Sequence, residues 1–378
     1  MRAGPIVGML AILVADAVPA VAVTFTELVG TERTTKPLSD ALAASVGRAL
    51  PVVSASPGLG FAFDPVTGAY ERRTTITGQL FLERAEPLGR GHWNVSVSYQ
   101  RVKLDRFEGE DLEALHDDAV GIVAPRGNPV TFPRFQLDLD THEITTSLTY
   151  GVTDDMDLNL TVPALWSEFR VRLTQLSAGG ERVFADSATR LGVGDVFVRG
   201  KYRVVKESWL QTALGLVLRL PTGEEDDFQG TGTFDVTPMV YGSTRPWRPT
   251  PPIALQPYLN AGVDLNTDDV GASEARWGVG VDVAIVERTT LAAAFLARHP
   301  FRRIAPAGFF TFPRVAGPAR PLFGIDGDRP DIYDLSFGGR VNVWRDTLMA
   351  FANVIVALNP DDGVRSEAIP TFGLEASF

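Results

Sequence analysis

The sequence predicts an all-β protein: a closed antiparallel transmembrane β-barrel of about twelve strands, with a short helical segment near the N-terminus. Three observations predict it. Runs of about ten residues alternate between apolar and polar side chains, connections alternate between short and long, and the last strand ends on an aromatic residue. Alternation with a period of two marks a strand with one apolar face. The strands of a β-sandwich also alternate but average about six residues, whereas a tilted strand that crosses a bilayer needs about ten.

Residues 1–22 have the composition of a secretory signal peptide. A basic residue near the start precedes the apolar residues 6–14, and the small residues Ala20 and Ala22 form a cleavage site. The alternative is an uncleaved membrane anchor. It fits poorly, because a spanning helix needs about 20 apolar residues and Asp16 interrupts this stretch. We therefore expect export and a place in the bacterial outer membrane.

Residues 23–84 are predicted to form a segment that lies in the periplasm or plugs the barrel. A short amphipathic helix is expected over residues 38–50, because apolar residues recur there at helical spacing: Leu38, Leu42, Val46 and Leu50. The helix either enters the lumen or packs at the periplasmic mouth. Residues 74–82 alternate like a strand, but one more strand would make the count odd, so we place them inside or beneath the barrel.

The barrel is predicted over residues 85–378. Six of its runs have apolar side chains at every second position: residues 93–100, 155–166, 209–220, 255–266, 277–285 and 333–344. Several begin or end on Trp or Tyr, as the aromatic girdles of membrane barrels do. Short connections are expected to be periplasmic turns. Long ones, among them residues 106–133, 175–189 and 299–330, are expected to be external loops.

The last ten residues explain why the chain ends as a strand. Apolar side chains occupy every second position up to the final residue, Phe378. This strand has to pair with the first one, because an open sheet edge in lipid leaves main-chain groups unsatisfied at several kcal/mol each. A terminal strand of this kind also resembles the signal that barrel-assembly machinery reads. We expect that machinery, outer-membrane lipids and lipopolysaccharide as partners.

Composition excludes several classes of function. Cysteine is absent, which removes disulfides, thiol nucleophiles and Cys-based metal sites. The four His residues are scattered along the chain, so neither a metal site nor a cofactor is predicted. A formal net charge of -11 argues against a nucleic-acid partner. An enzyme is not expected either. Outer-membrane phospholipases place Ser two positions after His, whereas His142 and His92 are followed there by Ile144 and Asn94.

If the apolar rows face lipid, the opposite rows face the lumen. The predicted lumen-lining residues are Asp155, Asp157, Asn159, Asp195, Arg199, Lys201, Arg203, Arg219, Asp264, Asp282, Asp334, Arg340 and Glu375. They could form a charged constriction that orients a solute, or a salt-bridged interior that holds a narrow barrel together.

The longest loop is rich in aromatic side chains. It could form an apolar ligand vestibule or a structural lid over the barrel mouth, through Phe301, Phe309, Phe310, Phe312 and Phe323.

Parts of residues 58–70, 80–112, 191–204 and 218–227 resemble bacterial outer-membrane proteins of the meta-pathway phenol-degradation family. The most specific part is "GVGDVFVRGKYR", followed by a strand that ends in "LPTG". The resemblance implies an outer-membrane barrel that passes small hydrophobic or aromatic compounds, loosely similar to long-chain fatty-acid channels. It carries over no ligand residue. A structural or adhesive barrel without transport is the alternative, and a lipid-modifying enzyme is the least favoured.

Overall fold

The computed structural model describes most of the barrel and part of the segment that precedes it. The described residues are 48–52, 54, 60–64, 69–73, 81–107, 109–116, 121–123, 129–177, 180–207, 209–250, 253–286, 288–302, 311–312, 320–321, 331–344, 347–359 and 363–378. The predicted signal peptide lies outside this part, as does most of the predicted helix over residues 38–50, of which only residues 48–49 are described as helical. No helix among the described residues is long and apolar enough to cross a bilayer.

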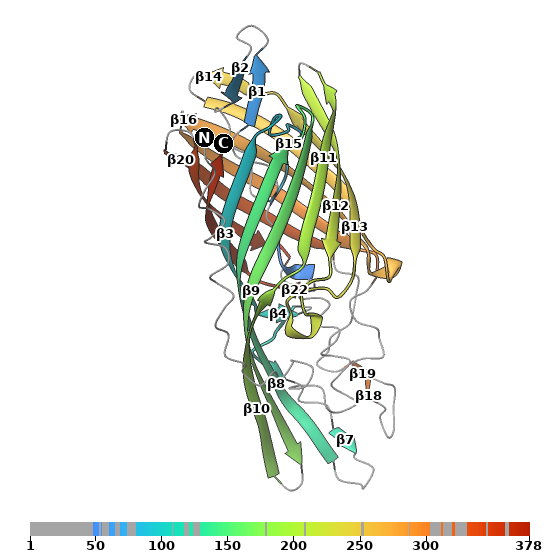
Figure 1. Ribbon diagram of the computed structural model, residues 1–378. Coiled ribbons are helices and arrows are strands. Elements are labelled where there is room, and N and C mark those ends of the chain that lie inside the picture. Colours follow the sequence, from blue (N-terminus) through green and yellow to red (C-terminus); the bar gives the residue numbers. More distant parts are fainter. Residues whose placement is uncertain are drawn as a thin grey trace.

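Twelve antiparallel strands form a closed barrel (Figure 1). In order they are β3 (Trp93–Leu104), β8 (Pro129–Gly151), β9 (Met156–Ser177), β11 (Val196–Lys206), β12 (Leu210–Leu220), β13 (Asp235–Thr244), β15 (Ile253–Asn266), β16 (Glu274–Val286), β17 (Thr289–Pro300), β20 (Ile332–Trp344), β21 (Leu348–Ala357) and β23 (Ala368–Ser377). β23 pairs with β3 and closes the sheet. The prediction of a closed barrel of about twelve strands is confirmed.

Further strands pair with the barrel strands or form separate small sheets. β10 (Gly180–Val193) pairs with β9, β14 (Trp247–Thr250) with β15, and β6 (Leu115–His116) and β7 (Gly121–Val123) with β8. Separate small sheets contain β1 (Gly60–Asp64) with β2 (Ala69–Arg73), β18 (Thr311–Phe312) with β19 (Arg320–Pro321), and β22 (Val364–Arg365) with β4 (Arg106–Phe107) and β5 (Glu110–Asp111). Two 3₁₀ turns, η1 (Glu225–Asp227) and η2 (Val270–Ala272), lie in the connections.

Side chains alternate between the outside and the inside of the barrel. On β9, Leu158 and Leu160 are 45% and 44% exposed, whereas Asp157 and Asn159 between them are buried. The exposed apolar side chains of the barrel strands form a belt that we call the lipid-facing belt: Val97, Leu158, Leu160, Tyr202, Leu214, Leu216, Val240, Leu259, Val279, Leu291, Phe337, Val341, Phe372 and Leu374. An apolar exterior around a polar interior is the arrangement of a barrel surrounded by lipid.

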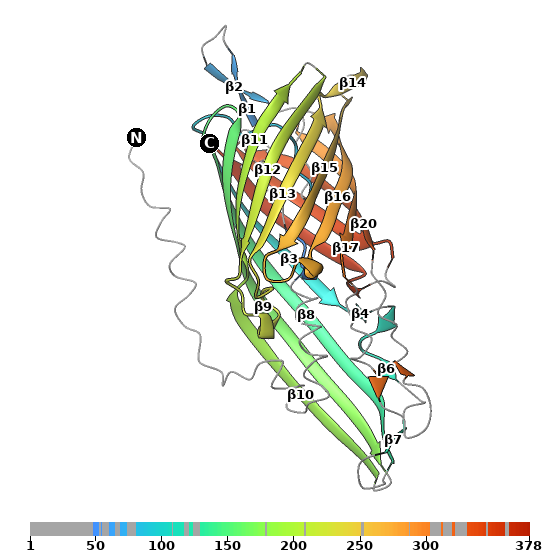
Figure 2. The ribbon, with the colours of Figure 1, turned by 90° about the vertical axis from the view of Figure 1, so that its right-hand side faces the viewer.

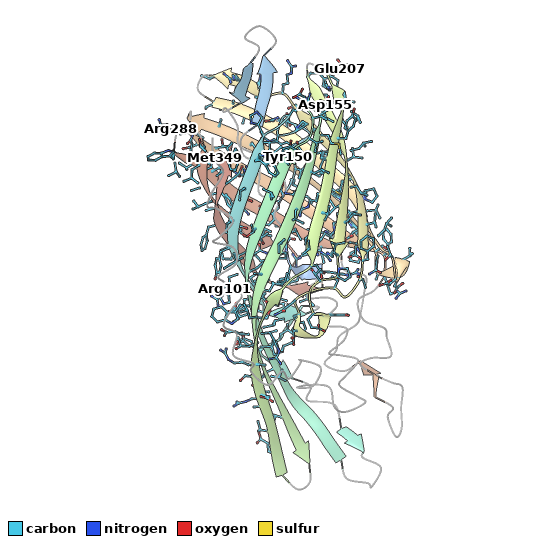
Figure 3. The ribbon with its side chains drawn as sticks, viewed as in Figure 1. Arg101, Tyr150, Asp155, Glu207, Arg288 and Met349 are labelled. Atoms are coloured by element: carbon cyan, nitrogen blue, oxygen red, sulfur yellow. The ribbon has the colours of Figure 1, made fainter. Side chains whose placement is uncertain are left out.

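The two ends of the barrel differ. One end, called the turn end here, carries the short connections and the C-terminus. Figure 3 labels Tyr150, Asp155, Glu207, Arg288 and Met349 around it. The opposite loop end carries the long connections, and there β8, β9 and β10 continue past the barrel as a three-stranded ribbon (Figures 1 and 2).

The ribbon replaces one expected loop. Residues 175–189 were expected to be one of the long external connections, but most of them lie in β9 and β10. β9 leaves β11 after Phe197↔Thr161 and pairs with β10 from Val193↔Ala164 onward, so its main-chain groups stay hydrogen-bonded outside the barrel. The ribbon alternates in the opposite sense to a membrane strand, because Phe169 and Val171 are buried whereas Arg170 and Arg172 are exposed. It therefore lacks the apolar outer row by which a membrane strand is predicted.

A segment before the first strand lies inside the barrel. This inner segment, residues 81–88, is held by side chains of the wall. The main-chain N–H of Ala85 donates to Ser243 Oγ at 3.2 Å, and that of Leu88 donates to the Asp157 carboxylate at 2.9–3.0 Å. Main-chain groups that no strand pairs are thus satisfied by polar lumen residues. Residues 74–80 lie outside the described part.

Candidate solute cavity in the lumen

A cavity of about 220 Å³ lies in the loop-end half of the lumen. Its walls are the barrel strands, the start of the inner segment and residues 48–52. The wall residues Arg219 and Asp264 stand near the loop ends of β12 and β15, and Asp334 stands at the loop end of β20. The cavity therefore lies on the loop-end side of the inner segment.

Part of the cavity lining is apolar. Phe197, Val217 and Met239 stand on the neighbouring strands β11, β12 and β13, and Phe197 is buried. Phe81 and Leu82 of the inner segment add further apolar lining. A dry cavity of about 150 Å³ is large enough to bind benzene. The volume here is larger, so one aromatic ring and a small substituent fit.

Two arginines flank the Phe197 ring. The guanidinium carbon of Arg199 lies 5.4 Å from the ring centroid and that of Arg219 lies 5.1 Å away. Both side chains are buried. They reach the ring because β11 places Phe197 and Arg199 at alternate, inward-facing positions, and β12 pairs Arg219 directly with Phe197. A cation over an aromatic face is attracted by the ring quadrupole.

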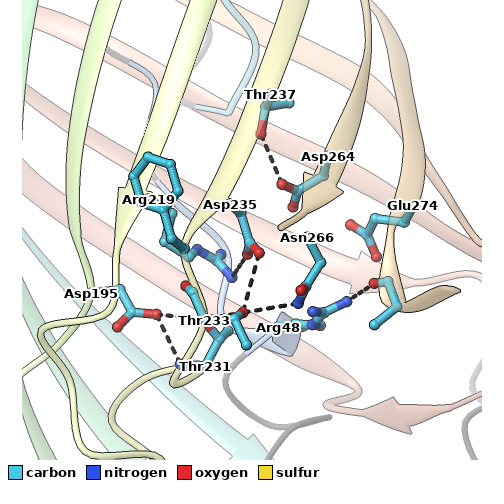
Figure 4. Close-up of polar contacts among 12 residues, drawn as sticks. Arg48, Asp195, Arg219, Thr231, Thr233, Asp235, Thr237, Asp264, Asn266 and Glu274 are labelled. Atoms are coloured by element: carbon cyan, nitrogen blue, oxygen red, sulfur yellow. Dashed lines mark hydrogen bonds and ion pairs between the residues drawn. The ribbon is translucent and has the colours of Figure 1, made fainter. Parts of the chain in front are cut away.

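A ladder of polar contacts runs across β13 and β15 at the loop end (Figure 4). Arg219 Nη1 lies 3.5 Å from Asp235 Oδ2, and Thr233 Oγ1 donates to the other Asp235 oxygen at 3.2 Å. Thr237 Oγ1 donates to Asp264 at 2.8 Å. Asp264 also pairs with Arg276, which contacts Glu274 as well. The carboxylates on this side are therefore engaged by arginines of the wall.

Asp195 belongs to a different structure at the same end. Its carboxylate accepts the main-chain N–H and the hydroxyl of Thr231, both at 2.9 Å, and the main-chain N–H of Gly223 at 3.1 Å. It thus joins the β10–β11 connection, in which it lies, to the β12–β13 connection, which contains Gly223 and Thr231. It does not line the cavity.

The turn-end half of the lumen is filled by the inner segment and by buried charges. Lys201 lies between Glu83 (3.7 Å) and Asp157 (4.0 Å). Arg340 donates to Glu375 at 2.8 Å. Tyr258 donates to Asp282 at 3.0 Å. Pairing of this kind is what a filled, narrow barrel needs, since an isolated buried charge is costly.

The predicted lumen residues thus separate into groups. Arg199, Arg219, Asp264 and Asp334 line the cavity. Asp157, Asn159, Lys201, Asp282, Arg340 and Glu375 are buried in the wall elsewhere, and Asp195 joins the loops. Asp155 and Arg203 pair with each other at the turn end, 2.7 Å apart.

Other cavity residues were not predicted. Phe197 lies on the inward row of β11 with Arg199, and the same alternation would have found it. Arg276 lies on β16 just before the alternating run over residues 277–285, and Arg298 lies on β17, for which no alternating run is identified. Arg365 lies outside the barrel strands, so no periodicity points to it. Phe81 belongs to the alternating residues 74–82, which are expected inside or beneath the barrel without being assigned to a cavity.

The predicted vestibule stays a prediction. Phe309, Phe310 and Phe323 lie outside the described residues, and Phe312 is described only as part of β18. Phe301 is 44% exposed at the loop end of β17, where its N–H donates to the Ser273 carbonyl at 2.8 Å.

No family model matches the chain, and no curated protein matches it. Several solved structures are similar to it, among them the following three. An outer membrane channel from Pseudomonas putida F1 is 13% identical with a TM-score of 0.47, and the match covers 79% of this chain and 100% of that one. NanC porin is 9% identical with a TM-score of 0.41, covering 74% and 98%. A FadL homologue from Pseudomonas aeruginosa is 9% identical with a TM-score of 0.31, covering 76% and 90%. These likenesses concern the fold alone, and the resemblance to the meta-pathway phenol-degradation family stays a prediction.

Proposed function

We propose that this protein is a channel of the bacterial outer membrane that passes small hydrophobic or aromatic solutes. The observation that carries the proposal is the cavity of about 220 Å³ inside a closed barrel with a lipid-facing belt. Its apolar lining on β11–β13, which includes Phe197, suits one ring, and its position near the loop end suits a solute that arrives from outside.

The inner segment defines what passage requires. It lies between the cavity and the turn end, and wall side chains hold its main chain at Ala85 and Leu88. A solute that has reached the cavity can continue only when this segment shifts. Because the inner segment occupies the lumen, the channel is narrow and selective, in contrast to a wide diffusion pore.

The test is accumulation of a labelled one-ring solute such as toluene in Gram-negative host cells with intact lipopolysaccharide. Val217→Trp fills the cavity, whereas Leu216→Trp, one position away on β12, points into the lipid-facing belt. We expect the wild type and Leu216→Trp to raise accumulation and Val217→Trp to abolish the increase. Equal accumulation in cells with and without the protein would refute the proposal.

A structural barrel without transport is the second candidate. The filled turn-end half of the lumen, with Lys201, Glu83 and Asp157 in one group, favours it. The accumulation assay in the same host cells distinguishes a channel from a structural barrel. A structural barrel leaves accumulation unchanged in every variant, while its removal weakens the outer membrane toward detergents.

A further inference from the structure

We infer that the cavity contains a subsite for the anionic group of its solute, so that the preferred solute is an aromatic carboxylate. This inference deepens the proposed function and rests on it. Six arginines line the cavity, Arg48, Arg199, Arg219, Arg276, Arg298 and Arg365, against three carboxylates, Glu83, Asp264 and Asp334.

Three of these arginines have carboxylate partners. Arg219 pairs with Asp235, Arg276 with Asp264, and Arg365 with Asp334. Arg276 also contacts Glu274, so these three arginines face four carboxylates and contribute no excess of positive charge.

The other three arginines bind only neutral oxygens within the part of the chain that the structure describes. Arg199 donates to Asn159 and Thr161, Arg298 donates to the carbonyl of Arg48 at 2.9 Å, and Arg48 donates to the carbonyl of Ala272. The third lining carboxylate, Glu83, lies 3.7 Å from Lys201 and is shared with that ammonium group. With their direct partners Lys201, Asp157, Asp235 and Glu274 included, the lining groups are seven cations and six carboxylates, a net charge of +1.

Arg199 is the centre of the subsite. It is only 8% exposed, and both of its hydrogen bonds come from Nη1, to Asn159 Oδ1 at 3.3 Å and to Thr161 Oγ1 at 3.1 Å. Nε and Nη2 remain for a second acceptor. A guanidinium offers parallel N–H groups that match the two oxygens of a carboxylate. Because a buried charge without a counter-ion is costly, a bound anion would stabilise this site.

The apolar lining of the cavity determines what the anion is attached to. Phe197 lies directly under the Arg199 guanidinium, and Val217 and Met239 continue the same wall. A carboxylate on Arg199 therefore brings its substituent against these side chains. A free inorganic anion would leave that apolar surface uncovered, and a neutral ring would leave Arg199 without its counter-charge.

The experiment measures binding to the purified, folded barrel in detergent by calorimetry, with three probes. Benzoate carries ring and charge, benzyl alcohol the ring alone, and acetate the charge alone. We expect benzoate to bind more tightly than either of the others. Arg199→Gln should weaken benzoate about tenfold or more, the loss of one hydrogen bond to a charged group, and leave benzyl alcohol unchanged. Arg199→Lys should restore part of the loss.

The matched control is Arg248→Gln, since Arg248 is exposed on β14 outside the lumen and should leave all three affinities unchanged. Arg298→Gln serves as the second lumen variant if Arg199→Gln does not fold, and it should weaken benzoate selectively as well. Equal binding of benzoate and benzyl alcohol, equal binding of benzoate and acetate, or no effect of the lumen variants would overturn the inference. Binding needs no transport, so failure of the accumulation test alone would remove the channel and leave the anion subsite.

Discussion

Asn260 pairs with both main-chain groups of Glu83. Its Nδ2 donates to the Glu83 carbonyl and its Oδ1 accepts the Glu83 N–H, each at 2.6 Å. All of these atoms are buried, and 177 positions separate the two residues in the chain. A side-chain amide here takes the place of a neighbouring strand and fixes the inner segment to β15.

Replacing this amide should loosen the inner segment before it affects the barrel. Asn260→Leu leaves the Glu83 N–H and C=O unsatisfied, which costs about 1–3 kcal/mol per group. We expect faster hydrogen exchange at residues 83–85, measured by mass spectrometry, with the barrel strands still protected. Asn353→Leu is the control, because Asn353 bonds to Ser336 on the opposite wall. Equal exchange in both variants would contradict the role of Asn260.

The lipid-facing belt predicts that the stability lost on substitution by Arg depends on the depth of the residue in the bilayer. Leu216 lies in the middle of β12 and is 45% exposed, whereas Leu210 begins that strand at the turn end. Arg on a lipid face costs about 2–4 kcal/mol at the bilayer midplane and about 0–1 kcal/mol near the interface. Leu216→Arg should therefore lower the free energy of unfolding in lipid vesicles far more than Leu210→Arg, as urea titration measures. Similar losses would place β12 outside a bilayer.

The seam between β23 and β3 should be the most sensitive place for barrel closure. A Cβ added to Gly373 would lie 2.3 Å from the Val97 carbonyl oxygen and 2.6 Å from the Phe351 ring. Gly373→Val should therefore reduce the fraction of folded, heat-modifiable barrel on a gel. Gly242→Val provides the comparison, since its Cβ would have no neighbour closer than 4.0 Å. A normal folded fraction for Gly373→Val would show that the seam tolerates displacement.

The turn end predicts a pH dependence. Burial alone would raise the pKa of Asp155, but hydrogen bonds and charge from Lys206 and Arg203 hold it below its ordinary value. A folded pKa below the unfolded value of about 3.9 means that the contribution is complete above that pH and is lost as pH falls through the folded pKa. Asp155→Asn should lower the urea midpoint at pH 7 and lose less stability than the wild type down to pH 3. Glu207→Gln, an exposed neighbour at the same end (Figure 3), should keep the wild-type profile.

The barrel itself could be predicted because lipid imposes one pattern on every membrane strand. Leu158 and Asp157 face opposite sides for the same reason as Leu216 and Val217, so the strands, the faces and the closing pair follow from alternation. The β9–β10 ribbon lies beyond that constraint. Its pairing comes from the neighbouring strands, and its apolar row on β9, with Leu165, Phe169 and Val171, is buried on the face opposite to the lipid-facing row of the same strand.

The cavity could be predicted only in part. Arg199 and Arg219 stand on inward rows and were found by position, but their shared contact with Phe197 depends on the register of β11 against β12. Register follows from pairing partners far apart in the chain. The contacts of the inner segment, such as Glu83 with Asn260, bring together residues for which no local pattern exists.

Spin labels on β12 test the central claim most directly, that apolar rows face lipid while a solute cavity occupies the interior. The chain has no cysteine, so Leu216→Cys and Val217→Cys can each be labelled singly. In proteoliposomes the label at 216 should be accessible to oxygen and shielded from a water-soluble nickel complex. The label at 217 should be shielded from oxygen, and it should abolish benzoate binding because, like Trp at this position, it fills the cavity. Equal oxygen accessibility at the two positions, or unchanged benzoate binding with the label at 217, would contradict the account.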